Sequence, residues 1–211
     1  MLPMDIYTGI FIYIIIVLSA VFHEYAHGFV AEQLGDDTAK AAGRLTLNPF
    51  VHLDMVGTVL LPLVFLFTPG FGFFIGWAKP VPYNPYNLRD KKYGSLKVAL
   101  AGPASNIIIA IVLGIIIRIA MPFSLMSPVA IQLIAFVAYI NIILAIFNLI
   151  PVPPLDGSKI LFDLVPSAGR ALGRIGFIGI ALALVIAFYV LAPIAQIVFY
   201  IITGVHLGAL L

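Results

Sequence analysis

The sequence predicts an all-α integral membrane protein with about five transmembrane helices and a re-entrant, partly extended segment between the first and second full crossings. Hydrophobic residues make up 63% of the chain and charged residues only 9%, whereas a soluble domain carries about 25% charged residues. Several apolar stretches also reach the ~20 residues that a helix needs to cross a bilayer. No water-soluble fold could bury this much apolar surface, so we expect a multi-pass protein of the cell membrane.

The first apolar stretch, 6–34, is predicted to be one helix. Its first sixteen residues, from Ile6 to Val21, carry no charge. Gly35-Asp36-Asp37 ends the pattern, because glycine and aspartate favour turns. The stretch lacks a basic start and a small-residue cleavage pattern, so we do not expect a removable signal peptide.

The second apolar stretch, 51–77, is broken by glycine and proline. We expect a helix over about 53–67 and a more extended path over 71–78, because the second part is rich in phenylalanine and glycine. Three further stretches are predicted to span the membrane: 96–119, 129–149 and 175–202. Together they predict a single intramembrane domain over 1–211, with its core at about 6–160 and a C-terminal helix at about 175–203.

The distribution of basic residues predicts the topology. Ten of the eleven Lys and Arg residues lie in 35–49, 78–97 and 155–174, and none lies in the 121–128 link. Cytoplasmic loops carry an excess of Lys and Arg, so the N-terminus and the 121–128 link are expected outside. Stretch 51–77 then begins and ends on the same side, which makes it re-entrant, because two helical crossings would need about 40 residues. The alternative is one full crossing that breaks the charge rule once.

The chemistry is carried by His23-Glu24-Tyr25-Ala26-His27, which follows the uncharged run. Residues four apart on a helix share a face, so both imidazoles can bind one zinc ion. Glu24 lies beside the first ligand and can act as a general base toward a metal-bound water. Ionisable groups in a membrane helix are costly and usually functional, which favours a metal site over a chance occurrence of the pattern.

Asp156 is the best candidate for a third ligand. A catalytic zinc site usually has three protein ligands, and the chain has no cysteine. Asp156 follows Pro151-Val152-Pro153-Pro154, whose prolines stop the preceding helix and let the chain turn a carboxylate back toward the core. His23 lies about 26 Å along its helix from Ile6 at ~1.5 Å per residue, toward the cytoplasmic face, and Asp156 emerges at the same face.

Two other groups in the sequence have two alternative interpretations. His52 and Asp54 either line the site or mark the interface where stretch 51–77 enters the membrane. The active site is expected to open toward the cytoplasmic side.

These motifs resemble a known family. H-E-Y-A-H at 23–27, A-G-P-A-S-N at 101–106 and N-L-I-P-V-P-P-L-D-G at 148–157 are similar to the motifs of the site-2 protease family of intramembrane zinc metalloproteases. G-R-L-T-L-N-P at 43–49 and G-W-A-K-P-V-P at 76–82 resemble its short microbial members. The matches follow the family's order and cover its catalytic core.

The resemblance implies one Zn²⁺ per chain, held by His23, His27 and Asp156, with Glu24 as the general base. Asn148 corresponds to the family's asparagine that helps to hold the substrate or the developing oxyanion. Asn106 corresponds to a residue of the helix beside the site. The family's membrane-inserted β element corresponds to stretch 51–77.

The family also implies the partners. Substrates are membrane-spanning proteins, often membrane-tethered regulators such as anti-sigma factors, cut in or near the lipid bilayer. An extended edge at 71–81 is expected to pair with an unwound substrate strand. The chain has no room for the PDZ or CBS domains of larger members, and nothing in it resembles a nucleic-acid footprint.

A rival hypothesis from another class is a non-proteolytic membrane metal-binding protein or metal transporter that uses the same ligands. Transporters usually contain repeated halves with paired broken helices. This sequence has one ligand helix and no duplication, and a transport site does not need a glutamate beside the first histidine. The sequence leaves the substrate and the oligomeric state open.

Overall fold

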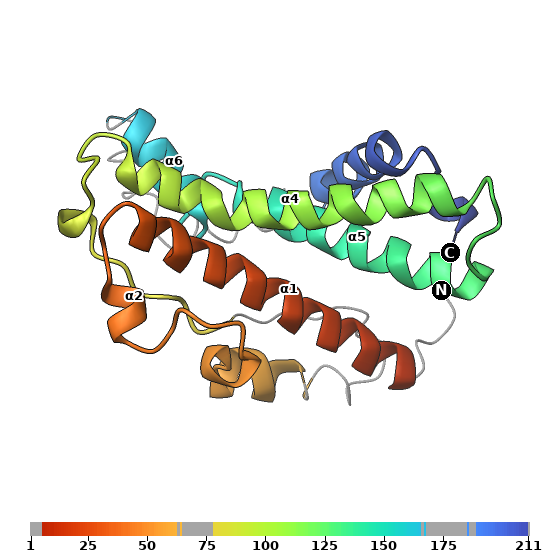
Figure 1. The fold of residues 1–211 in the computed structure, drawn as a ribbon, viewed down its shortest axis with the longest axis horizontal. Helices are drawn as coiled ribbons and strands as arrows, with labels where there is room; N and C mark the ends of the chain where they lie inside the picture. Colours follow the sequence, from red (N-terminus) through yellow and green to blue (C-terminus); the bar gives the residue numbers. More distant parts are fainter. Residues whose placement is uncertain are drawn as a thin grey trace. The chain divides into compact units, whose positions relative to one another are not determined.

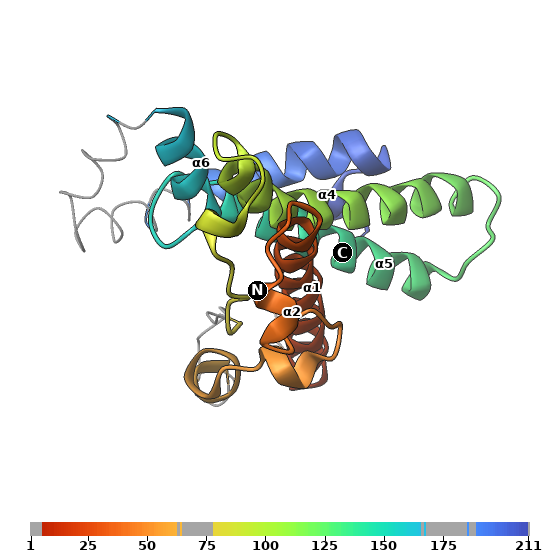
Figure 2. The same ribbon diagram turned by 60° about the vertical axis from the view of Figure 1, so that its left-hand side comes forward.

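The computed structural model describes residues 6–62, 64, 78–165, 167, 185 and 189–210. The chain divides into two compact units, one ending at Arg89 and the other beginning at Asp90. Among the described residues every regular element is helical and no β-strand is present, which confirms the all-helical prediction for this part of the chain. Figures 1 and 2 show the elements from two directions.

The first unit is built on α1, Ile6–Gln33. The helix contains no proline, so nothing interrupts its backbone hydrogen bonds over 28 residues. It ends at Gln33, two residues before Gly35, whose φ of +100° suits glycine. The amides of Gly35 and Asp36 then bond back to the carbonyls of Glu32 and Ala31, both at 2.9 Å. The helix predicted over 6–34 is therefore confirmed.

A buried carboxylate, Asp36, holds the end of α1 against two other segments. It accepts hydrogen bonds from the amide and hydroxyl of Thr38, at 3.2 and 2.5 Å. Thr38 begins the short helix α2, Thr38–Ala41, which lies beside α1 in Figure 1. Asp36 also accepts from the Asn84 amide at 2.6 Å and the Asn87 side chain at 2.9 Å. Burial alone would raise the pKa of Asp36, but these hydrogen bonds lower it below its ordinary value.

Two short turns follow α2: η1, Pro49–His52, and η2, Met55–Leu60, which is π-type. Each begins at a polar residue that accepts hydrogen bonds from backbone amides, Asn48 for η1 and Asp54 for η2. Residues 61, 62 and 64 are also helical. The helix predicted over 53–67 is thus present in part. The extended path predicted over 71–78 lies outside the described residues except at 78.

The second unit contains two long antiparallel helices, α4, Gly94–Ala120, and α5, Pro128–Asn148. They lie side by side in both views, and the apolar helix Tyr189–Thr203 packs with them. Their shared core consists mainly of small and branched residues: Ala110, Ile117, Ala120, Ile131, Ala135, Ala138, Ile142, Ala195 and Phe199. Gly114 permits close approach, because a Cβ there would lie 2.3 Å from Ile202 Cγ2.

A short helix, α6, Asp156–Leu164, packs against α4. The sequence does not predict α6, because its nine residues give too little periodicity to identify a helix. The helices predicted over 96–119 and 129–149 are confirmed by α4 and α5. Of the helix predicted over 175–202, the structure describes the part from Tyr189, and residues 175–184 lie outside the described residues.

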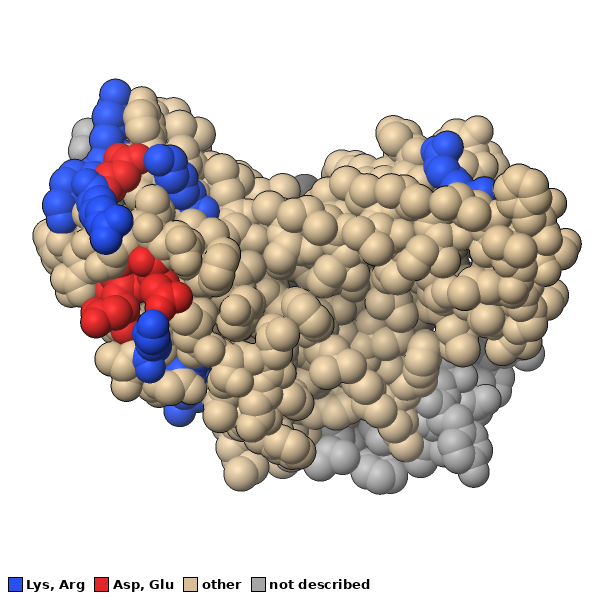
Figure 3. All heavy atoms as spheres, viewed as in Figure 1, with Lys and Arg blue, Asp and Glu red and all other residues tan. Residues whose placement is uncertain are grey.

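Within the described residues, three helices are long and apolar enough to cross a membrane: Gly9–Gln33, Gly94–Ala120 and Pro128–Asn148. No charged residue lies between Lys97 and Arg118 on α4, and Figure 3 shows Lys and Arg side chains near the beginning and the end of this helix with uncharged surface between them. Arg118 donates to the carbonyls of Ile201 and Ile202 and so caps the helix Tyr189–Thr203. These helices place the protein in a membrane, while the count of five crossings and the re-entrant path remain predictions.

Candidate metal centre

The two histidines of the motif form a close pair on α1. Their Nε2 atoms lie 3.1 Å apart, and their rings meet edge to face with centroids 4.7 Å apart. Both side chains are buried, at 6% and 7% exposure for His23 and His27. Two nitrogens bound to one zinc at ~2.05 Å in tetrahedral geometry would lie about 3.3 Å apart. The pair therefore fits a zinc ion with almost no rearrangement.

Gly28, the residue after His27, allows the rest of the first unit to approach this part of α1. A Cβ at Gly28 would lie 3.0 Å from Val81 Cγ1, 3.2 Å from Ala39 Cβ and 3.3 Å from Leu45 Cδ1. A larger residue would push these three side chains away. The absence of a side chain at Gly28 thus allows the segment that contains Val81 to lie close to His23–His27.

Glu24 is held by this same segment. Its Oε2 accepts a hydrogen bond from the backbone amide of Val81 at 2.8 Å. The segment is fixed in turn, since the Lys79 amide donates to the His52 carbonyl at 2.8 Å. Val81 is not predictable from the sequence, because a backbone donor 57 positions from Glu24 leaves no pattern in the side chains.

His52 and Asp54 have local structural roles in the first unit. His52 is 1% exposed, and its Nε2 donates to the Thr46 carbonyl at 2.8 Å. Its Nδ1 has no hydrogen-bond partner among the described residues. The Asp54 carboxylate accepts from the amides of Val56 and Gly57, at 3.1 and 2.7 Å, and so caps η2. A lining role for either side chain stays a prediction.

Asp156 lies in the second unit, at the first position of α6, and is 5% exposed. Its Oδ1 forms an ion pair with Lys159 Nζ at 3.0 Å, one turn further along the helix. The next residue, Gly157, fits tightly against the end of α5: a Cβ there would lie 2.2 Å from the Leu149 carbonyl oxygen and 2.5 Å from that of Ile150. Only glycine allows this approach, so the Asp-Gly sequence fixes where the carboxylate emerges.

The far end of α6 is attached to α4 by Asp163. Its carboxylate accepts a hydrogen bond from the Leu96 amide in the first turn of α4, where the residue preceding that helix, Tyr93, provides no side-chain cap. Asp163 Oδ2 is buried and has no hydrogen-bond partner among the described residues. Burial raises the pKa of Asp163 above its ordinary value. Asp163 therefore positions the helix that carries Asp156.

The two asparagines predicted near the site lie on different helices of the second unit. Asn148 ends α5, and its Nδ2 donates to the Leu144 carbonyl at 3.0 Å. Asn106 lies inside α4, and its Nδ2 donates to Asn141 Oδ1 on α5 at 2.8 Å. Asn141 in turn donates to the Val137 carbonyl at 2.9 Å. The Asn106–Asn141 pair thus joins α4 to α5 by a hydrogen bond between two helices.

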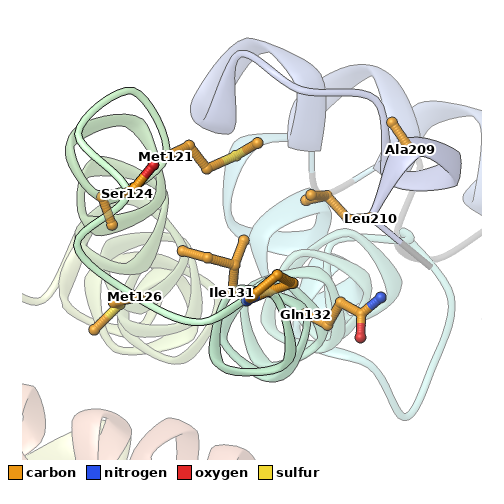
Figure 4. A pocket seen from close by; sticks show the side chains of 9 residues that line it. Met121, Ser124, Met126, Ile131, Gln132, Ala209 and Leu210 are labelled. Atoms are coloured by element: carbon orange, nitrogen blue, oxygen red, sulfur yellow. The ribbon is translucent and has the colours of Figure 1, made fainter.

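A pocket of about 400 Å³ lies at the other end of the second unit. Figure 4 shows Met121, Met126, Ile131 and Leu210 among the side chains around it. It opens at the beginning of α5, whereas Asp156 follows the end of that helix. The length of α5, about 30 Å at ~1.5 Å per residue, separates the two, so this pocket is not part of the metal centre.

Residues 113–192 match the sequence profile of peptidase family M50. The protein named "Putative zinc metalloprotease YwhC" of Bacillus subtilis is 40% identical over 167 residues, which cover 76% of this chain and 72% of that protein. This chain belongs to peptidase family M50. The match confirms the resemblance to site-2 proteases, and zinc is the metal of the family. The two buried imidazoles of this M50 member fit that metal.

Two further relatives carry names of the same kind. "Putative zinc metalloprotease Rip2" of Mycolicibacterium smegmatis is 31% identical over 172 residues, or 79% of this chain and 62% of its own length. "Putative zinc metalloprotease MJ0611" of Methanocaldococcus jannaschii is 34% identical over 141 residues, or 67% of this chain and 63% of its own length. The M50 chain thus spans less than two thirds of these two relatives. No solved structure matches it.

Proposed function

We propose that this M50 member is an intramembrane zinc metalloprotease that cleaves membrane-spanning proteins in or near the bilayer. The observation that carries the proposal is the buried His23–His27 pair, with Nε2 atoms 3.1 Å apart, on a helix long and apolar enough to span. Glu24 lies between the two histidines on that helix. A carboxylate and two imidazoles within a membrane-spanning helix carry a free-energy cost, so such groups usually have a function.

The proposed metal ligands are His23, His27 and Asp156. Two neutral imidazoles and a carboxylate are a usual ligand set for catalytic zinc and leave a fourth position open. Asp156 is buried at the beginning of α6, and Gly157 fixes the path of the backbone beside it. Its Oδ1 lies 3.0 Å from Lys159 Nζ, and a carboxylate ligand binds a metal in its ionised form.

These residues would hold zinc, which would supply a bound water with a pKa of about 7 and a Lewis acid for the scissile carbonyl. Glu24 takes a proton from the attacking water on its carboxylate and passes it to the leaving amine of the cleaved peptide. Asn148 supplies a hydrogen-bond donor for the oxygen of the scissile carbonyl. Its Nδ2 carries two hydrogens, of which the Leu144 carbonyl accepts one, and loss of one such donor typically slows catalysis about 10²–10³-fold.

The surface of the first unit supports a membrane-embedded path for stretch 51–77. Phe50 and Met55 are 78% and 76% exposed, and between Arg44 and Lys79 the sequence contains a single charged residue, Asp54. The Asp54 carboxylate is occupied in capping η2. Such a surface suits lipid rather than water. We propose that this stretch is re-entrant, with the active site toward the cytoplasm and the N-terminus outside.

The test compares Glu24→Gln with the wild type in the host membrane. Glu24→Gln keeps the metal ligands, so it is expected to retain zinc and to abolish cleavage. Comparative membrane proteomics should then show membrane-spanning proteins that accumulate uncut. His23→Ala should lose both zinc and cleavage. Identical membrane proteomes for wild type and Glu24→Gln, together with zinc flux in proteoliposomes, would refute the protease and favour the transporter.

A further inference from the structure

The described segment Lys79-Pro80-Val81-Pro82 has no backbone amide left to offer a partner. The Lys79 amide donates to the His52 carbonyl and the Val81 amide donates to Glu24 Oε2, both at 2.8 Å. Pro80 and Pro82 have no amide hydrogen. All donors of 79–82 are therefore directed into the first unit or missing. A strand edge without donors pairs poorly with an added strand.

Residues 79–82 could serve either of two roles, which are pairing with a substrate strand and support of the Glu24 carboxylate. Strand addition to a substrate would need alternate amides on an open edge. Residues 79–82 have none, so this part of the predicted 71–81 edge is unsuited to strand addition. Residues 79–82 instead support the reactive carboxylate.

We propose that the backbone amide of Val81 is the positioning donor for Glu24, the general base of the proposed protease. A glutamate side chain rotates about three bonds, and proton transfer requires its carboxylate to be within hydrogen-bond reach of the attacking water. The Val81 amide fixes Oε2 and thereby leaves Oε1 to exchange the proton. This inference rests on the proposed function.

The amide can hold Glu24 because Val81 is itself held. Its side chain is 7% exposed and packs against Gly28, one helical turn after Glu24. On the other side of Pro80, the Lys79 amide is attached to His52, whose buried ring is bonded to Thr46. α1 therefore contacts the segment twice, once through the carboxylate and once through the glycine. His52 contributes as an anchor of this segment.

The experiment removes the amide hydrogen of Val81 in two ways. Val81→Pro removes it between two prolines that already impose an extended backbone. Replacing Val81 by its α-hydroxy acid analogue, which forms an ester bond, removes the same hydrogen and keeps the valine side chain. Val81→Ala is the matched control that retains the amide. The probe is a reconstituted single-span protein chosen from those that accumulate uncut with Glu24→Gln.

We expect Val81→Pro and the ester to lower kcat about 10–100-fold, with KM and zinc content unchanged. Val81→Ala keeps the amide but shortens the side chain that packs against Gly28, so it should lower kcat clearly less than the ester does. Equal kcat values for the ester and Val81→Ala would overturn the inference. A rise in KM at unchanged kcat would also overturn the inference, because the amide would then bind substrate. Loss of zinc from both Val81→Pro and the ester would overturn it as well. If the wild-type protein cleaves nothing and Glu24→Gln behaves identically, the proposed function itself is refuted.

Discussion

The two halves of the proposed zinc site are built in different ways. The histidine half lies within one regular helix, α1, where the four-residue spacing alone brings two Nε2 atoms to 3.1 Å. The aspartate half begins a short helix, α6, whose position depends on backbone packing at Gly157 and on the Asp163 cap of α4. The first half is fixed by local geometry and the second by tertiary packing. Their sensitivity to mutation should differ accordingly.

The largest effect is expected from Gly157→Ala. The new Cβ would lie 2.2 Å from the Leu149 carbonyl oxygen, and backbone cannot move aside as a side chain can. The beginning of α6 and Asp156 should shift, with a loss of about 1–3 kcal/mol in stability and at least ~100-fold in cleavage, since ~1 Å of misplacement is enough for that loss.

Gly208→Ala is the matched control in the same unit, because a Cβ there meets nothing within 4 Å. Cleavage rate and thermal stability in detergent should remain at wild-type values in this control. Wild-type cleavage by Gly157→Ala would contradict the tight placement of Asp156.

A smaller effect is expected from Gly28→Ala in the histidine half. Its Cβ would lie 3.0–3.3 Å from the ends of three side chains, which can yield by a few tenths of an ångström. We expect a loss of about 1 kcal/mol in stability and roughly 3–10-fold in cleavage, with zinc content unchanged, because the histidines belong to the same helix. A loss of cleavage as large as in Gly157→Ala would remove the distinction between the two halves.

The smallest effects concern two buried carboxyls, one in each unit. The pKa of Asp36 is lowered, so its contribution to stability exists above the ordinary value of about 3.9 and is lost as the pH falls through the lowered pKa. The pKa of Asp163 is raised, so its contribution exists below about 3.9 and is lost as the pH rises through the raised pKa. The two groups therefore act on stability in opposite directions.

Thermal unfolding of Asp36→Asn and Asp163→Asn between pH 3 and pH 7 measures both contributions. Asp36→Asn should lower stability by about 1 kcal/mol at pH 7 and should weaken the loss that the wild type suffers below about pH 4. Asp163→Asn can still accept the Leu96 hydrogen bond, so it should change stability little at low pH and remove the decline that follows ionisation at higher pH. Parallel pH profiles for the two variants would contradict these assignments.

Sequence patterns were sufficient for the parts that depend on local periodicity. The apolar runs predict α1, α4 and α5 nearly to the residue, and the histidine spacing predicts the close imidazole pair. The patterns could not reveal the Asp36 cluster, the amide of Val81 or the contact at Gly157, because each depends on backbone groups that leave no pattern in the side chains. The Asp163–Leu96 bond, which joins α6 to α4, is of the same kind. Lys159 had a weak signal, since it follows Asp156 at the spacing of a helical ion pair.

Zinc content per chain tests the central claim most directly. Purified wild type, His23→Ala, Asp156→Ala and Asp163→Asn would be measured by elemental analysis after equilibration with buffered zinc. We expect about one zinc ion per chain for the wild type and for Asp163→Asn, a change on the same helix that leaves the ligands intact, and almost none for the other two. Full zinc occupancy with unchanged affinity in Asp156→Ala would contradict the proposed role of Asp156 as a zinc ligand.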